Sequence, residues 1–210
     1  HRYVAGRTAA LLGRDLADLN LIVLHLGNGA SATAVRGGRS VETSMGFTPL
    51  EGLVMGTRCG DLDASIPAFL RGVGMSDADV DTLLQHRSGL AGLCGDNDMR
   101  AVLARRADGD AAAAMAFDVY CHRLRKYVGA YHAVLGRLDA IAFTAGVGEH
   151  SADVRATCLA GLESWGITVD EGRNAAGTGA RFVSPDGRSS VAVSGLGLLV
   201  LLPLLLIVAI

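Results

Sequence analysis

The sequence predicts an α/β domain, because strand-like and helix-like segments are mixed along the chain. Residues 21–24 and 140–143 are short apolar runs typical of buried strands, and each leads into a glycine-rich turn. Residues 31–44 contain two strand-like runs around Gly37 and predict a β-hairpin. Residues 110–135 are rich in alanine and predict one long helix. The mixture of strands, a hairpin and a long helix favours the α/β class.

The other segments are assigned in order along the chain, whose 210 residues suit one large domain or two small ones. Residues 49–60 are irregular, glycine-rich and poor in charge, and Asp61 or Asp63 is expected near the N-terminus of the helix that follows. No internal repeat of fixed period is visible. The remaining predicted elements are a helix at 4–16, hairpin strands at 31–35 and 40–44, helices at 64–71, 76–85 and 98–106, a helix from Ser151, and a short strand at 167–169.

The composition excludes several classes of function. The formal net charge is −2, from 19 basic and 21 acidic residues, whereas nucleic-acid binding usually shows as a basic excess or stripe. The cysteines Cys59, Cys94, Cys121 and Cys158 form no CxxC pair, so we predict no zinc site and no disulfide framework. Reduced thiols in a cytoplasmic protein are therefore expected. The start of the chain shows neither a signal-peptide core nor an initiator Met, as expected of a fragment.

The last segment, residues 191–210, is uncharged and consists mostly of Leu, Val and Ile. Its length is close to the roughly 20 residues that a helix needs to span a bilayer. Three interpretations are open for it: a membrane helix, buried strand and helix in a soluble core, or a frame-shifted end that was never selected for structure.

Two glycine-rich turns are candidate phosphate-binding loops. Glycine permits positive φ and close approach, so such turns can bring backbone N–H groups up to a phosphate. Each turn is also compatible with a tight connection between packed elements, and its histidine with an exposed loop residue. The first turn comprises His25, Leu26, Gly27, Asn28 and Gly29, and the second comprises Gly146, Val147, Gly148, Glu149 and His150.

Arg58 is a candidate catalytic residue because it lies between glycines in an uncharged stretch. It is either a solvated surface arginine or a side chain that holds an anion with its planar fork of donors. Phosphoryl transfer needs such a group, since negative charge on the transferred phosphoryl must be neutralised in the transition state.

Three segments in a fixed order closely resemble the acetate kinase (acetokinase) family. They read HLGNG at residues 25–29, TSMGFTPLEGLVMGTRCGDLD at 43–63, and FTAGVGEHS at 143–151. The resemblance extends from His1 to about Val193 and identifies residues 1–193 as a C-terminal nucleotide-binding domain, followed by a divergent apolar tail at 194–210. It implies a ribonuclease-H-like ATPase domain of the sugar kinase, heat-shock ATPase and actin superfamily, with a mixed sheet flanked by helices.

The resemblance also implies an activity, the reversible transfer of the γ-phosphoryl group from ATP to acetate, which gives acetyl phosphate and ADP with Mg²⁺. By position, His25 to Gly29 match the phosphate-contacting segment of the family, and Arg58 matches the arginine that stabilises the transferring phosphoryl group. The nucleotide contacts implied beyond these are the adenosine triplet Asp98, Met99 and Arg100 and the second loop from Gly146 to His150. The family usually has Asn where this chain has His150. The resemblance therefore implies backbone contacts to the nucleotide at this position, but not the contact of the Asn side chain.

Departures from the family pattern limit what this chain is expected to do alone. The N-terminal domain is absent, and with it the transition-state histidine, the substrate arginine, the catalytic aspartate and an early asparagine of the family. The Mg²⁺-linked glutamate, expected after Val193, is missing too, so no metal ligand is assigned and the fragment alone is expected to be nearly inactive. The resemblance further implies a homodimer in the cytoplasm. The alternatives are a propionate or butyrate kinase, and a non-enzymatic, membrane-tethered nucleotide-binding fragment.

Overall fold

The computed structural model describes residues 1–176, 181–182 and 190–193, and the apolar tail at 194–210 lies outside these residues. Its strands are β1 (Asn20–Leu26), β2 (Ala30–Arg36), β3 (Arg39–Thr43), β4 (Ala140–Thr144), β5 (Arg181–Phe182) and β6 (Ser190–Val193). Its helices are α1 (Arg2–Leu12), α2 (Ile66–Gly72), α3 (Asp77–His86), α4 (Gly89–Cys94), α5 (Met99–Ala107), α6 (Ala111–Leu135), α7 (Ala145–His150), α8 (Ala152–Leu159) and α9 (Glu171–Ala175), with single 3-10 turns at Leu16–Asp18 and Glu163–Trp165.

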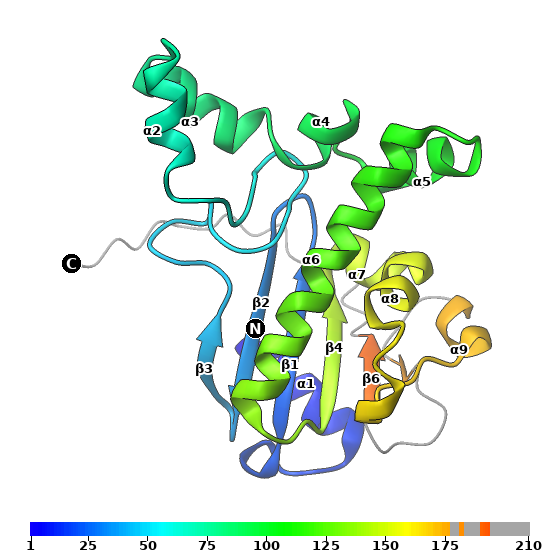
Figure 1. Ribbon diagram of the computed structural model, residues 1–210. Helices are drawn as coiled ribbons and strands as arrows, with labels where there is room; N and C mark the ends of the chain where they lie inside the picture. The colour runs from blue at the N-terminus through cyan, green and yellow to red at the C-terminus, as the bar shows by residue number, and fades with distance from the viewer. Residues whose placement is uncertain (177–180, 183–189, 194–210) are drawn as a thin grey trace.

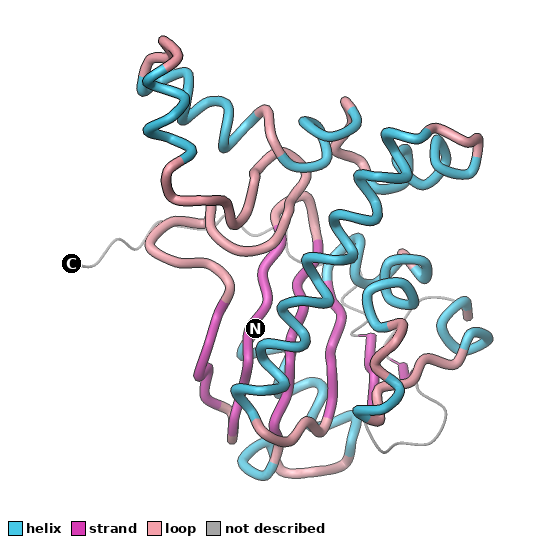
Figure 2. Tube along the Cα trace, viewed as in Figure 1, coloured by secondary structure: helices cyan, strands magenta, loops and turns pink. Residues whose placement is uncertain are grey.

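The described strands form one mixed sheet in the order β3-β2-β1-β4-β6-β5, with helices on both faces (Figure 1). The predicted hairpin is confirmed, since β2 and β3 pair in antiparallel fashion around Gly37 and Gly38, and β1 pairs with β2 in the same sense. The next pairings are parallel, β1 with β4 and β4 with β6. The strands lie side by side at the centre of the molecule in Figure 2. The predicted α/β class is therefore confirmed.

The central strand β1 is buried on both faces, and its side chains alternate between two cores. Leu21 and Val23 pack with α1 on one face of the sheet, while Ile22 and Leu24 pack into the larger core under α6 on the other. This alternation follows from the two-residue period of a strand. In Figure 1 α6 runs diagonally across the front of the sheet and α1 lies behind it.

The predicted long helix is confirmed as α6, which carries much of the larger core. Asp110 caps its start, because the Asp110 carboxylate accepts hydrogen bonds from the N–H groups of Ala112 and Ala113. Phe117 and Leu124 are among its fully buried side chains. No helix in the described part of the chain combines the length and the apolar composition needed to cross a bilayer.

Two local predictions were wrong. The expected turn at Gly146, Val147 and Gly148 lies inside the short helix α7, which begins directly after β4. Residues 167–169 form no strand; Ile167 follows a 3-10 turn, donates its N–H to Leu162 and packs into the larger core. In both places specific contacts with neighbouring elements accompany a conformation that local composition did not predict.

Arg155 on α8 is fully buried and holds α7 against α9. Its guanidinium donates to the carbonyl oxygens of Gly148 and Glu149 at 2.8 and 2.9 Å. It also donates to the side-chain and backbone oxygens of Asn174 at 2.7 and 2.8 Å. The planar fork of donors suits this multiple contact, because it satisfies acceptors on two elements at once.

We predict that Arg155→Met lowers the free energy of unfolding by roughly 3 kcal/mol or more, because buried acceptors on α7 and α9 lose their donor. The matched control is Arg71→Met, which removes an exposed arginine paired with Asp77 on the surface. The control should cost less than about 1 kcal/mol. Urea unfolding followed by circular dichroism measures both, and equal losses in the two variants would contradict the role of Arg155.

Candidate functional site

A pocket of about 600 Å³ lies where the carboxyl end of the sheet meets α5, α6 and α7. Its wall combines apolar side chains with backbone, amide and charged groups, so the pocket suits a ligand that has both apolar and polar parts. The apolar wall consists of Leu90, Met99, Leu103, Tyr120 and Val147. The remaining wall residues are Gly27, Asn28, Gly56, Asn97, Asp98, Arg100, Gly146, His150, Ser151 and Asp153.

The parallel pairing of β1 with β4 brings both predicted glycine segments to this pocket. His25 and Thr144 are register partners at the ends of the two strands. The chain that follows β1 therefore emerges beside the chain that follows β4. Ligands of open α/β sheets commonly bind outside the carboxyl ends of such strands.

The first segment is held by a loop that comes from elsewhere in the chain. The Gly56 N–H donates to the carbonyl oxygen of Asn28 at 2.8 Å. A Cβ at residue 56 would lie 1.9 Å from the Asn28 side-chain oxygen, so any larger residue would have to displace that side chain. The Asn97 amide nitrogen lies 3.2 Å from the same oxygen. The backbone of Asn28 and the oxygen of its side chain are thus both constrained.

Arg58 lies beside this segment, although it does not line the pocket. A Cβ at Gly29 would lie 2.8 Å from Nη2 of Arg58, which puts the guanidinium directly against the first loop. Nη1 of Arg58 donates to the carbonyl oxygen of Pro49 at 2.7 Å. The Arg58 guanidinium therefore lies next to the backbone of Gly29, in the turn that follows β1.

The loop that carries Arg58 is fastened to α6 through Asp61. The Asp61 carboxylate accepts hydrogen bonds from the Gly52 N–H at 2.8 Å and from the Tyr127 hydroxyl at 2.9 Å. Arg123 pairs with it at 3.1 Å and also donates to the Gly52 carbonyl. Burial, followed by the hydrogen bond to Asp61, raises the pKa of Tyr127, so the phenol stays a donor. These contacts hold the loop against α6, the helix that contributes Tyr120 to the pocket wall.

Residues 98–100 all line the pocket, but they differ in burial and in their hydrogen bonds. Met99 is buried, and the Arg100 side chain is 91% exposed. The Asp98 carboxylate caps α5 at the Arg100 N–H and pairs with the Arg100 guanidinium. The side-chain and backbone hydrogen bonds from Arg100 lower the pKa of Asp98 to about 2. Asp98 is therefore ionised at neutral pH and engaged by its own helix.

Some residues of the second segment, Gly146 to His150, line the pocket, and others stabilise the helix α7. Gly146, Val147 and His150 line the pocket, whereas Gly148 packs against Phe143. The Glu149 side chain is buried and turns back, since its carboxylate accepts from the Ala145 N–H at 3.1 Å and the Thr144 hydroxyl at 3.3 Å.

Ala145, the first residue of α7, has a φ of +65°. This is a costly backbone conformation for a residue with a Cβ. The hydrogen bond from its N–H to Glu149 helps to hold it, so Glu149 supports the start of the helix.

His25 and Leu26 lie at the end of β1 and outside the pocket wall. Leu26 is fully buried in the core, so its side chain supports the strand and does not face a ligand. His25 is exposed at the strand end. Partial burial of the imidazole lowers the pKa of His25 below its ordinary value of 6.5, against an opposing effect of Glu149.

Several wall residues could not be recognised in the sequence. Gly56 and Asn97 adjoin residues that were singled out, Arg58 and Asp98, but nothing marked them as neighbours of Asn28. Tyr120 lies mid-helix with no local signal, and its buried hydroxyl has no hydrogen-bond partner among the described residues. The other unrecognised wall residues are Leu90, Leu103, Ser151 and Asp153.

The chain matches one protein family over nearly its whole length. Residues 1–195 match the model of the Acetokinase family. The acetate kinases of Streptomyces avermitilis and Streptomyces coelicolor are 64% and 63% identical over 196 residues, which make up 92% of this chain and 48% of each relative. The chain therefore spans about half the length of the curated relatives that it matches.

Solved structures agree with the sequence match. The acetate kinase of Porphyromonas gingivalis superimposes with a TM-score of 0.89 at 36% identity, over 92% of this chain and 49% of that one. A propionate kinase of Francisella tularensis superimposes with a TM-score of 0.86 at 40% identity, over 92% of this chain and 50% of that one. The sequence resemblance is thus confirmed, and the chain belongs to the acetokinase family.

Proposed function

We propose that this chain is the nucleotide-binding part of an ATP:acetate phosphotransferase, which forms acetyl phosphate and ADP reversibly. The observation that carries the proposal is one pocket lined by Asn28, by residues 98–100 and by α7, with Arg58 beside Gly29. Family membership supports the same reaction. The remaining catalytic groups would come from the part of the relatives that this chain does not match, so the chain alone should form no acetyl phosphate.

The apolar and polar wall residues support one orientation of ATP. The planar base would pack on the apolar wall formed by Met99, Leu103 and Val147, since such walls bury ring surface. The phosphates would then lie near the Gly27 backbone, the Asn28 amide and the Arg58 guanidinium. An arginine at that end would neutralise charge that develops on the transferred phosphoryl group.

The described residues offer no group of three or more His, Cys, Asp or Glu side chains that could hold a metal ion. Mg²⁺ is commonly bound through nucleotide phosphates and water with few protein carboxylates. We therefore propose that Mg²⁺ enters as the nucleotide complex, and we assign no protein ligand to it in this chain.

A propionate kinase is the second candidate, because the Francisella tularensis propionate kinase superimposes nearly as well as the acetate kinase of Porphyromonas gingivalis. The pocket described above concerns the nucleotide and does not contact the acyl group in this proposal. Acetate is preferred because two curated relatives with over 60% identity are acetate kinases.

We also propose a cytoplasmic location, since all four cysteines are free thiols, as is usual in a reducing compartment. Cell fractionation tests this, and recovery outside the cytoplasm would contradict it.

A homodimer is proposed on separate grounds. Phe69 and Val73, four residues apart at α2, are each 64% exposed, and such neighbouring apolar side chains could form part of a subunit interface. We expect sedimentation equilibrium to give the mass of two chains. A single-chain mass at every concentration tested would overturn the proposal.

The reaction is tested by joining this chain to the part of the Streptomyces avermitilis relative that it does not match. We expect the fusion to form acetyl phosphate from ATP and acetate, measured as the hydroxamate, faster than from propionate or butyrate. Arg58→Ala should lower kcat by roughly 10³-fold, and Arg58→Lys should restore only part of it, because lysine lacks the planar fork. A folded fusion without activity, or full activity in Arg58→Ala, would refute the assignment.

Nucleotide binding by the chain itself is tested with Gly56→Ala. The new Cβ displaces the Asn28 side chain, so ATP binding should weaken roughly 10-fold or more. The fold should be kept, since the exposed Asn28 side chain can rotate away. Gly6→Ala is the matched control, because nothing lies within 4 Å of a Cβ there. Calorimetric titration with MgATP gives the Kd values; unchanged binding by Gly56→Ala would count against this pocket.

His25 should be uncharged at neutral pH and should therefore meet a phosphate only as a neutral donor. As the pH falls below about 6.5, the unfolded chain takes up a proton at His25 before the folded chain does. The stability contributed by neutral His25 is thus present above that pH and lost below it. NMR titration should show a pKa for His25 under 6.5. His25→Gln should flatten the acid side of the stability profile, whereas exposed His86→Gln on α3 serves as the control; no difference between them would contradict the prediction.

A further inference from the structure

Asn28 has a side-chain amide whose two ends differ in their surroundings. Its oxygen faces the Asn97 amide nitrogen at 3.2 Å and lies against the Cα of Gly56. Its nitrogen donates to no residue in the described part of the chain, and the side chain is exposed at the pocket wall. With the oxygen engaged, both N–H donors of Asn28 are available to a ligand.

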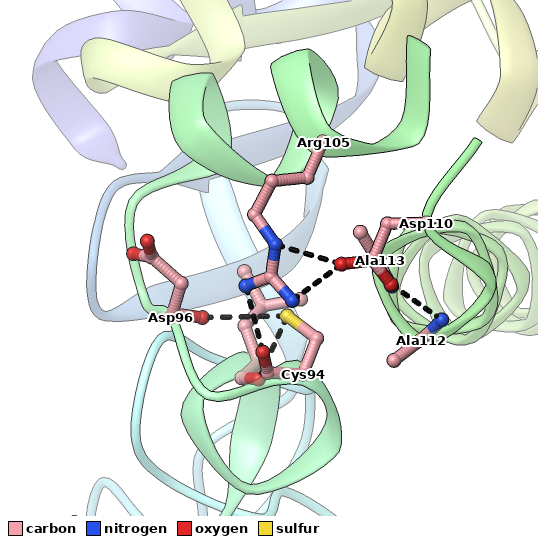
Figure 3. Close-up of polar contacts among 7 residues, drawn as sticks. Cys94, Asp96, Arg105, Asp110, Ala112 and Ala113 are labelled. Carbon is pink, nitrogen blue, oxygen red and sulfur yellow. Dashed lines mark hydrogen bonds and ion pairs between the residues drawn. The ribbon is translucent and has the colours of Figure 1, made fainter. Parts of the chain in front are cut away.

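Asn97 can orient Asn28 only if its own loop is fixed, and Figure 3 shows how this is done. Nη1 of Arg105 donates to the Cys94 carbonyl at 2.8 Å, while its other nitrogens bind the Asp110 carboxylate that caps α6. The Cys94 thiol contacts the Asp96 carbonyl at 3.7 Å. The Asp96 carboxylate accepts from the Asp98 N–H at 2.9 Å. Residues 94–98 are therefore tied to both α5 and α6.

The amide nitrogen of Asn97, which can only donate, is the end of that side chain that faces Asn28. The atom of Asn28 that faces it must therefore be the acceptor, the oxygen. Without this contact the Asn28 amide could rotate and present its oxygen to the pocket. A carbonyl oxygen repels a phosphate, whereas an amide NH₂ group binds it.

We propose that Asn97 is a positioning residue, which holds the Asn28 amide so that its NH₂ group recognises the phosphate oxygens of a nucleoside di- or triphosphate. The inference rests on the proposed nucleotide site. It adds that the orientation of the Asn28 amide makes this site favour ligands that carry phosphate. Asn97 itself contacts no phosphate in this account, and its effect passes entirely through Asn28.

The test compares ligands with and without phosphate on the full chain, by calorimetric titration with ATP, ADP and adenosine. Asn97→Ala should weaken ATP and ADP binding by roughly 3- to 10-fold and leave adenosine within about twofold. Asn97→Gln keeps a donor and should restore part of the loss. Gln85→Ala is the matched control, since it removes an amide that donates to Asp81 on α3, away from the pocket wall.

A double-mutant cycle decides whether the effect passes through Asn28. In an Asn28→Ala background, Asn97→Ala should cause no further loss of ATP binding, because no amide is left to orient. The inference is overturned if Asn97→Ala weakens ATP binding as much in the Asn28→Ala background as it does alone. It is also overturned if the single variant Asn97→Ala weakens the binding of adenosine and ATP equally. Neither result would contradict the nucleotide site itself. Failure of the unmodified chain to bind either ATP or adenosine overturns the proposed function, and the inference with it.

Discussion

The parallel pairing of β1 with β4 is the constraint on which the site depends. Its register puts His25 next to Thr144, so the segments that follow both strands start a few ångströms apart. Neither segment forms a pocket alone; the walls need both, together with α5 and α6. The parallel arrangement is possible because β1 and β4 are buried on both faces, with α1 on one side of the sheet and α6 on the other.

The unfavourable backbone conformation at the start of α7 is stabilised by two buried side chains, Glu149 and Arg155. Ala145 begins α7 with a positive φ, and the buried Glu149 carboxylate accepts its N–H. Arg155 then holds the carbonyl oxygens at the other end of this short helix. A helix of six residues has little stability of its own, so side chains from outside its backbone ladder must satisfy its ends. Glu149 therefore contributes to the site by shaping α7.

The structure separates two kinds of residue in the motifs that are similar to those of the family. Some reach the pocket, such as Asn28 and Val147, while others build the scaffold, such as Leu26 and Gly148. Arg58 belongs to neither group, because it lies against the first loop at one side of the pocket. A motif in sequence is thus a mixture of ligand contacts and packing requirements, and only the coordinates separate them.

The sequence by itself determined the local elements and the family. The buried strand at residues 21–24, the hairpin at Gly37 and the long alanine-rich α6 follow from short-range patterns, and the three motifs were enough to recognise an acetokinase. The tertiary structure alone decided that residues 145–150 are helical, that Ile167 packs without forming a strand, and that Gly56 and Asn97 both meet Asn28. The contacts of Asn28 join residues far apart in the chain, and the conformations of residues 145–150 and of Ile167 depend on specific side-chain and core contacts; pattern and propensity encode neither.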